Sequence, residues 1–129
     1  MPELRTISHT DTETEHTVVS VAGELDIATA ALFRTEVEEA IATAPAGDRV
    51  ILDCGELEFI DSSGLQALIK CYKACVGVNK ALVLAAPTER VVRILRVAAL
   101  DRRIPIYPTV AVALAASLTT PPRQGQSGK

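Results

Sequence analysis

Two short segments of this chain combine hydroxyl and carboxylate side chains where a helical pattern begins. They are Asp61-Ser62-Ser63-Gly64 and Gly23-Glu24-Leu25-Asp26. The first turn of a helix has free backbone N–H groups and a partial positive charge, so it can accommodate a phosphate attached to Ser62. We expect the small hydroxyls to be exposed, and Gly64 to leave no side chain in the way of an approaching partner.

Each segment also has an ordinary structural interpretation. Asp61 or Ser62 can serve as a simple N-cap, whose side chain accepts a hydrogen bond from a helix amide. Gly23–Asp26 can be a turn that ends a strand and leaves an acid near a helix N-terminus. Spacing alone favours these ordinary interpretations.

The hydrophobic pattern predicts strands and helices that alternate along the chain. Apolar residues at three- and four-residue steps predict helices, with Thr29 as the N-cap of the first and Gly77 at the end of the second. Val76 in the second helix and Ala98 in the third are expected to face the core, and the last helix is expected over Val110–Leu118. The predicted strands are Leu4–His9, Thr17–Ala22, Val50–Leu52, Ala81–Ala86 and Ile104–Tyr107, the last an edge strand because it contains Pro105.

The order of these elements, β-β-α-β-α-β-α-β-α, is typical of an α/β fold. It predicts a mixed, mainly parallel sheet of four to five strands, with an antiparallel edge and about four helices packed against it. Residues 1–118 are expected to form a single domain. Residues 119–129 are rich in Pro, Gly, Gln and Ser and are expected to be a disordered C-terminal tail.

The composition is that of a globular chain with few aromatic residues. Hydrophobic residues make up 48% of the 129, which argues against disorder of the whole chain, and aromatic residues only 3%, which argues against base stacking. Charge is uneven: 14 acidic and 3 basic residues precede Ser62, and 2 acidic and 10 basic residues follow from it, for a net charge of -3. Two interpretations remain open, because the halves can interleave and mix their charges, or the surface can be dipolar and orient a charged protein partner.

The cysteines do not suggest a metal or cofactor site, and we expect neither. Cys54, Cys71 and Cys75 are an odd number without a signal peptide, which indicates reduced thiols in a cytoplasmic protein. Two cysteines four residues apart with no nearby His make a poor zinc site, so all three are interpreted as packing residues, with a redox role as the alternative. The longest apolar runs are far shorter than the roughly 20 residues that span a membrane, so no membrane insertion is expected.

Taken together, the two segments resemble a known family. The pattern G-E-L-D, a helix, an apolar strand and then F-I-D-S-S-G-L, from Phe59 to Leu65, resembles the STAS domain and is most similar to the bacterial anti-sigma factor antagonists. The resemblance runs from about Thr17 to about Tyr107, and F-I-D-S-S-G-L is its specific part. Two departures stand out: Gln66 occupies a position where many relatives have a small residue, and Ala99 replaces an expected glycine.

The resemblance implies a regulatory role in transcription through partner switching. The partner would be an anti-sigma factor with a histidine-kinase-like ATPase fold, which phosphorylates Ser62, with Ser63 as a minor alternative acceptor. The unphosphorylated protein would bind this partner and release the sigma factor, phosphorylation would end the binding, and a phosphatase would reset the switch. The implied partner-binding residues are Asp26, Asp61, Ser62, Ser63, Gly64 and Gln66.

Three alternatives belong to other classes. A serine hydrolase would need an oriented base, yet the sequence has no G-x-S-x-G elbow and its only histidines, His9 and His16, are expected to be exposed turn residues, so no enzyme activity is expected. A non-switching STAS adaptor subunit of a transport or sensory complex would have the same order of strands and helices. Nucleic-acid binding would use the basic stretch, although a solvated helix face is the common explanation of such a pattern; its arginines are Arg90, Arg93, Arg96, Arg102 and Arg103.

Overall fold

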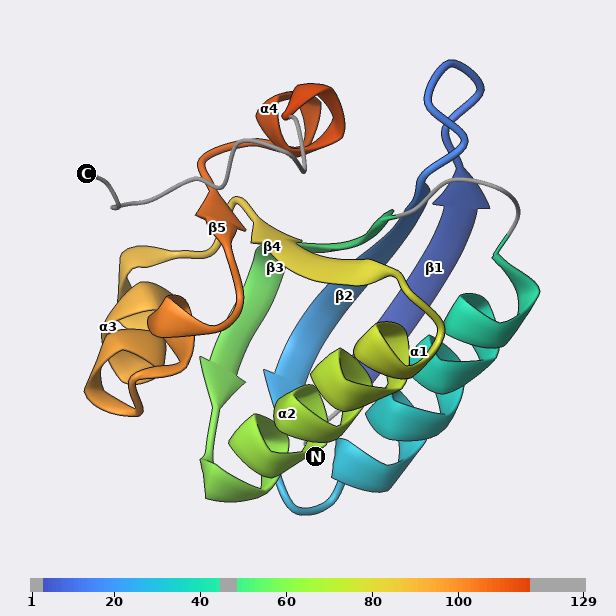
Figure 1. Ribbon diagram of the computed structural model, residues 1–129. Helices are drawn as coiled ribbons and strands as arrows, with labels where there is room; N and C mark the ends of the chain where they lie inside the picture. Colours follow the sequence, from blue (N-terminus) through green and yellow to red (C-terminus); the bar gives the residue numbers. More distant parts are fainter. Residues whose placement is uncertain (1–3, 45–48, 117–129) are drawn as a thin grey trace.

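The computed structural model describes residues 4–44 and 49–116 (Figure 1). Strands and helices alternate after an opening hairpin, in the predicted order. The strands are β1 (Leu4–Thr10), β2 (Thr17–Leu25), β3 (Arg49–Ile60), β4 (Ala81–Ala85) and β5 (Ile106–Tyr107). The helices are α1 (Ala30–Thr43), α2 (Ser62–Gly77), α3 (Glu89–Val97) and α4 (Val110–Ala115), with a 3-10 turn, η1 (Leu100–Arg102), after α3.

The strands form one sheet in the order in which they occur along the chain, β1-β2-β3-β4-β5. β1 pairs antiparallel with β2, and all other neighbours pair parallel. A five-stranded, mostly parallel sheet with four helices is the predicted fold class, which is thereby confirmed. The predicted tail at 119–129 lies outside the described residues.

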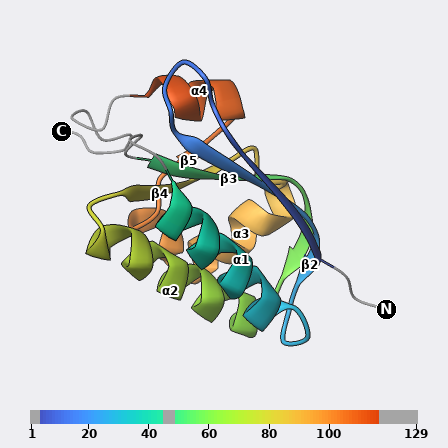
Figure 2. The ribbon, with the colours of Figure 1, turned by 90° about the vertical axis from the view of Figure 1, so that its right-hand side faces the viewer.

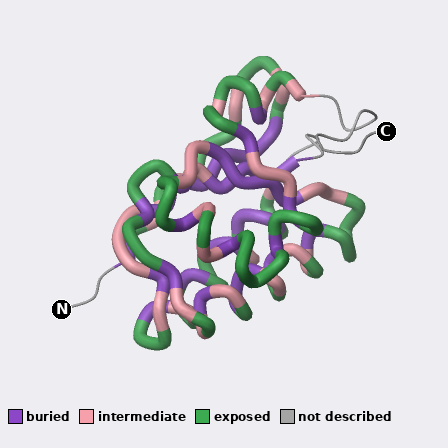
Figure 3. Tube along the Cα trace, turned by 90° about the vertical axis from the view of Figure 1, so that its left-hand side faces the viewer, coloured by how far each residue is buried: buried purple, intermediate pink, exposed green. Residues whose placement is uncertain are grey.

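Helices cover the two faces of the sheet unequally (Figure 1, Figure 2). α1, α2 and α3 pack on one face, where the larger core includes Phe33, Leu52, Leu68 and Leu95. α4 covers part of the other face over β3, β4 and β5, where a smaller core includes Ile51. The start of β3 is therefore buried on both faces, as its continuous apolar run predicts. Figure 3 shows the buried residues gathered along the strands and on the inward sides of the helices.

The predicted ends of β2 and β3 were wrong, because both strands extend further. The prediction ended one strand at Ala22 and the other at Leu52, whereas β2 continues to Leu25 and β3 to Ile60. Each of two register shifts against β2 places one extra residue in β3, and its burial then recurs at every third residue rather than every second. Gly23, at one of these shifts, has a φ of 113°, a backbone conformation that favours glycine. The sequence signal for a strand is lost here because the bulges break the two-residue alternation.

Two helical positions predicted to face the core are exposed instead. Four of the five buried residues of α2 are small, namely Gly64, Ala67, Cys71 and Cys75, and Val76 lies one position past this stripe at 55% exposure. Ala98 is exposed because α3 ends at Val97. β5 starts at Ile106, after Pro105, and is an edge strand as predicted. The end of the predicted last helix, Leu118, lies outside the described residues.

Candidate functional site

The segment Asp61–Gly64 forms the start of α2, directly after β3 ends. Asp61 caps the helix, because its Oδ1 accepts a hydrogen bond from the backbone N–H of Gly64 at 3.0 Å. Its carbonyl accepts the first helical hydrogen bond, from the N–H of Leu65 at 2.9 Å. Of the two N-cap candidates in the sequence, Asp61 is the cap, and the hydroxyl of Ser62 is not needed for that role.

Ser62 is the first residue of α2 and is exposed to solvent. Ser63 beside it is half-buried, and Gln66, one turn further along the helix, is exposed. Neither serine hydroxyl makes a hydrogen bond to another residue in the part of the chain that the structure describes. The first amides of a helix have no acceptor within the helix, and here Asp61 accepts from that of Gly64. The hydroxyl of Ser62 therefore lies beside backbone donors at the start of α2.

Gly64 does not face an approaching partner, so that expectation was wrong. The residue is buried against the end of β2, and a Cβ placed on it would lie 2.5 Å from the carbonyl oxygen of Leu25 and 2.8 Å from Cγ1 of Ile60. No side chain fits at those distances. Gly64 therefore lets the first turn of α2 approach β2 closely, and its contribution is to packing.

Asp26 organises the neighbouring turn between β2 and α1. Its Oδ1 accepts hydrogen bonds from the backbone N–H groups of Ala28 at 3.0 Å and Thr29 at 3.2 Å. Thr29 occupies the predicted N-cap position, but its side chain makes no cap hydrogen bond. The buried hydroxyl of Thr29 instead donates to the carbonyl of Glu24 at 2.8 Å and accepts from the N–H of Asp26 at 2.9 Å.

Strand pairing brings the two aspartates together. Leu25 at the end of β2 is paired with Ile60 at the end of β3, so Asp26 and Asp61 are the next residues on two adjacent parallel strands. The N–H of Asp61 also donates to the carbonyl of Leu25 at 3.1 Å, which fixes the start of α2 to the end of β2. Two carboxylates and the hydroxyl of Ser62 therefore share one edge of the molecule.

Two exposed apolar residues flank this edge and were not singled out from the sequence. Ile27, directly after Asp26, is 80% exposed, and Phe59, two residues before Asp61, is 38% exposed. Exposed large apolar side chains near a candidate site are a feature of protein interfaces. The signal for Ile27 was present in the sequence, as one apolar residue inside a polar turn.

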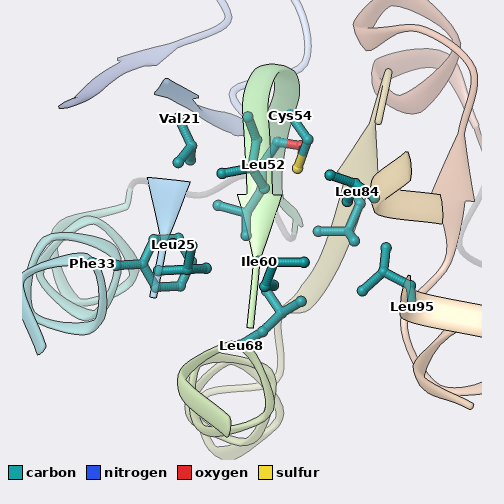
Figure 4. Close-up of a pocket in the computed structure, with 11 residues that line it drawn as sticks. Val21, Leu25, Phe33, Leu52, Cys54, Ile60, Leu68, Leu84 and Leu95 are labelled. Carbon is teal, nitrogen blue, oxygen red and sulfur yellow. The ribbon is translucent and has the colours of Figure 1, made fainter. Parts of the chain in front are cut away.

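A small apolar cavity lies beneath the edge, between the sheet and the helices (Figure 4). Leu25 and Ile60, the residues that precede the two aspartates, point into it together with Cys54. Burial raises the pKa of the Cys54 thiol to about 12, that of Cys71 to about 12 and that of Cys75 to about 11. All three thiols are buried and protonated at neutral pH, as expected for packing residues, and among the described residues there is no metal-binding group of His, Cys, Asp and Glu.

The histidines lie far from Ser62. His9 is exposed in β1 and pairs with Val18, and His16 precedes the first residue of β2. His16 is buried, so the prediction that both histidines are exposed was wrong for this residue. Since β2 carries Asp26 at its other end, about 30 Å separates His16 from the site at the usual rise per strand residue. Neither histidine can act as a base for the Ser62 hydroxyl.

A sequence model of the STAS domain matches residues 6–113, a range that contains both aspartate turns and every described helix except the end of α4. This chain belongs to the STAS domain family. The match confirms the resemblance to the STAS domain that F-I-D-S-S-G-L carries. Among the described residues of this STAS domain, no helix has the length and apolar character needed to cross a bilayer.

Similar proteins carry a common description. The anti-sigma F factor antagonist of Paenibacillus polymyxa is 30% identical to this STAS domain over 97 residues, which are 75% of this chain and 82% of that protein. The crystal structure of an anti-sigma factor antagonist from Mycobacterium paratuberculosis superposes with a TM-score of 0.75 at 28% identity, covering 87% of this chain and 92% of that one. The unphosphorylated anti-sigma factor antagonist SpoIIAA shares the fold, with a TM-score of 0.69 at 22% identity over 85% of this chain and 93% of that one.

Proposed function

We propose that this STAS domain is an anti-sigma factor antagonist that is switched off by phosphorylation of Ser62. The observation that carries the proposal is the exposed hydroxyl of Ser62 in the first turn of α2, left free because Asp61 caps the helix. The relatives named above, which are anti-sigma factor antagonists, support the general role. We define the acceptor edge as the exposed or half-buried residues around this hydroxyl: Asp26, Ile27, Phe59, Asp61, Ser62, Ser63 and Gln66.

In the unphosphorylated state the acceptor edge binds an anti-sigma factor and displaces the sigma factor from it. Ile27 and Phe59 supply apolar contact area, and the carboxylates of Asp26 and Asp61 supply charge that selects a basic surface on the partner. Gly64 is excluded from the contact because it is buried. Its role is to hold the first turn of α2 against β2, so that Ser62 is presented at a fixed position.

The anti-sigma factor itself acts as the kinase. The γ-phosphoryl group of ATP is transferred to Oγ of Ser62, the hydroxyl proton leaves to a base of the kinase, and ADP is released. The exposed position of Ser62 allows a kinase active site to reach it without local unfolding. Ser63, which is half-buried, is the less accessible of the two hydroxyls.

Phosphorylation ends the interaction by adding charge where acids already lie. A phosphoserine carries about -1.5 to -2 charges at neutral pH. Asp61 precedes it in the chain and Asp26 directly follows the adjacent strand, so the phosphate makes an already acidic edge more acidic. The amide of Gly64 is occupied by Asp61, which leaves the amides of Ser62 and Ser63 to receive the phosphate. The domain need not refold, and a phosphatase restores the binding state.

The experiment identifies the partner and then the acceptor. Ser62→Ala, which cannot be phosphorylated at that position, is used to copurify the anti-sigma factor from the protein's own cells. The recombinant partner is then incubated with wild type, Ser62→Ala and Ser63→Ala in the presence of Mg·ATP, and intact mass is measured. The proposal predicts one added phosphate on wild type and Ser63→Ala and none on Ser62→Ala.

Two outcomes contradict the proposal in different ways. Phosphorylation of Ser62→Ala to the same extent as wild type assigns the acceptor to another residue. Stable binding of a partner that leaves wild type unmodified, and that wild type retains in the presence of ATP, indicates a non-switching adaptor instead.

A further inference from the structure

The charge asymmetry of the sequence becomes an asymmetry of the molecule. The strands lie in the sheet in chain order, so β3 separates β1 and β2 from β4 and β5, while α2 packs against α1. Residues 4–44 contain eight acidic and two basic residues, a net charge of -6, and residues 81–116 contain two acidic and five basic residues, a net charge of +3. β1, β2 and α1 lie at one side of the molecule and β4, β5 and α3 at the other (Figure 1). Net negative charge therefore gathers around β1, β2 and α1, and net positive charge around β4, β5 and α3.

The positive side is concentrated on the outer face of α3. Val91 and Leu95 are buried, whereas Arg90, Arg93 and Arg96 are exposed. At 100° per residue these three arginines lie within about 120° of one another, opposite the buried pair. Val97 falls within the same arc and is 84% exposed. The face thus combines positive charge with an exposed apolar side chain.

The 3-10 turn that follows α3 adds to this surface. Arg102 and Arg103 are exposed in η1 and directly after it, and η1 packs against α3. In the part of the chain that the structure describes, none of the five arginines makes an ion pair or a side-chain hydrogen bond. We define the arginine face as Arg90, Arg93, Arg96, Val97, Arg102 and Arg103. Their guanidinium groups are free to bind a partner.

The composition of the arginine face favours an acidic protein surface as its ligand. All five cations are Arg, whose planar and weakly hydrated guanidinium pairs bidentately with carboxylates and is enriched at protein interfaces, where Lys is depleted. Val97 provides an apolar contact that a phosphate backbone does not need. The chain as a whole is acidic, at -3, and lacks an aromatic platform for bases.

The arginine face is within reach of a protein bound at the acceptor edge. α3 packs against β3, and β3 ends at Ile60, two residues before Ser62 (Figure 1). One partner can therefore contact both surfaces, with a basic region on the acidic edge and an acidic region on α3. Such paired complementarity increases the rate of association and fixes orientation more than it increases the lifetime of the complex.

We propose that the arginine face is a second docking surface, which binds an acidic region of the anti-sigma factor and accelerates its association. The inference rests on the proposed function, because it names a further contact with the same partner. It adds residues that the motif F-I-D-S-S-G-L does not contain.

The test measures the association rate of the recombinant anti-sigma factor, recovered as above, by stopped-flow fluorescence. The double variant Arg93→Glu/Arg96→Glu is compared with Lys70→Glu/Lys73→Glu, which makes the same change of net charge at exposed positions of α2. We expect the association rate constant to fall about tenfold for the α3 variant and less than twofold for the α2 variant. The neutral variant Arg93→Gln/Arg96→Gln, which avoids acidic residues near the helix C-terminus, should show a smaller fall in the same direction.

Each other result overturns the inference. An unchanged rate for both α3 variants, while wild type binds and Ser62 is phosphorylated, removes the second surface and leaves the proposed function intact. Equal slowing by the α2 variant shows that the effect does not belong to the arginine face. Retention of a labelled DNA duplex that the α3 variants lose, with no change in anti-sigma factor association, assigns the face to nucleic acid. Failure of wild type to bind the anti-sigma factor removes both proposals.

Discussion

Two strand-to-helix turns lie side by side at one edge of the sheet and use similar residues differently. At the end of β2, Asp26 caps the turn and Thr29 is buried, with its hydroxyl bonded to Glu24 and Asp26. At the end of β3, Asp61 caps α2 and the hydroxyl of Ser62 makes no bond within the described residues. A hydroxyl at a helix N-terminus is available for modification only when another residue does the capping and the backbone turns it outward. We call the turn after β2 the closed turn, because its hydroxyl is buried and bonded, and the turn after β3 the open turn, because its hydroxyl is exposed.

The largest effect is expected where the two turns touch. Gly64→Ala places a Cβ 2.5 Å from the backbone carbonyl of Leu25, and the backbone has to move to relieve the clash. We expect a loss of about 3 kcal/mol in the free energy of unfolding, measured by urea denaturation. Gly77→Ala is the matched control, because a Cβ there has no atom within 4 Å, and it should stabilise by about 0.5 to 1 kcal/mol. Equal effects of the two variants would contradict the close approach of α2 to β2.

The closed turn should depend on its buried hydroxyl. Thr29→Val keeps the shape of the side chain but leaves the carbonyl of Glu24 and the N–H of Asp26 without that partner. We expect a loss of about 2 kcal/mol in thermal or urea unfolding. Ser62→Ala, at the open turn, should change stability by less than about 0.5 kcal/mol, because exposed substitutions away from such features have small effects. A comparable loss from both variants would remove the contrast between the turns.

The open turn should depend on its aspartate for stability and not on its serine. Asp61→Ala removes the acceptor of the Gly64 N–H and should cost about 1 kcal/mol, whereas Asp61→Asn retains an acceptor oxygen and should cost less. Hydrogen exchange of the first-turn amides of α2 should increase in the alanine variant. Unchanged exchange would indicate that Asp61 is not the cap in solution.

The smallest effect is expected at a third turn, between α3 and η1. Ala99 has a φ of 61° and a ψ of 20°, a left-handed conformation that favours glycine. Ala99→Gly should stabilise by about 0.5 kcal/mol, since relief of the backbone strain outweighs the extra freedom of the unfolded chain. A loss of stability in thermal melts would show that the methyl group contributes more than the strain costs.

The sequence predicted the order of elements and the fold class because the apolar runs and helical periods are strong in most of the chain. It did not predict the full length of β3, where bulges change the spacing of the buried residues Cys54, Leu57 and Ile60 to every third position. It also placed Val76 inside, because large apolar residues dominate a periodicity argument, whereas four of the five buried residues of α2 are small.

At the site, the residue types of the acceptor edge could be predicted from the motif, but the structural role of each residue could not. Whether Asp61 or Ser62 is the cap depends on the backbone dihedral angles at the start of α2. The local sequence is compatible with either residue as the cap. The inward position of Gly64 depends on how closely β2 approaches α2, a tertiary distance that no local pattern contains. The arginines of the arginine face make no ion pairs among the described residues because the sheet order keeps them away from the acids of α1, which a local pattern does not show.

Regulation at the acceptor edge rests on one effect, which is that a phosphate on Ser62 abolishes binding there. The direct measurement is the affinity of the anti-sigma factor for the unphosphorylated protein and for protein quantitatively phosphorylated on Ser62, by isothermal titration calorimetry at one salt concentration. We expect phosphorylation to weaken binding at least about 100-fold, which corresponds to about 2.7 kcal/mol. Equal affinity of the two forms would contradict this expectation.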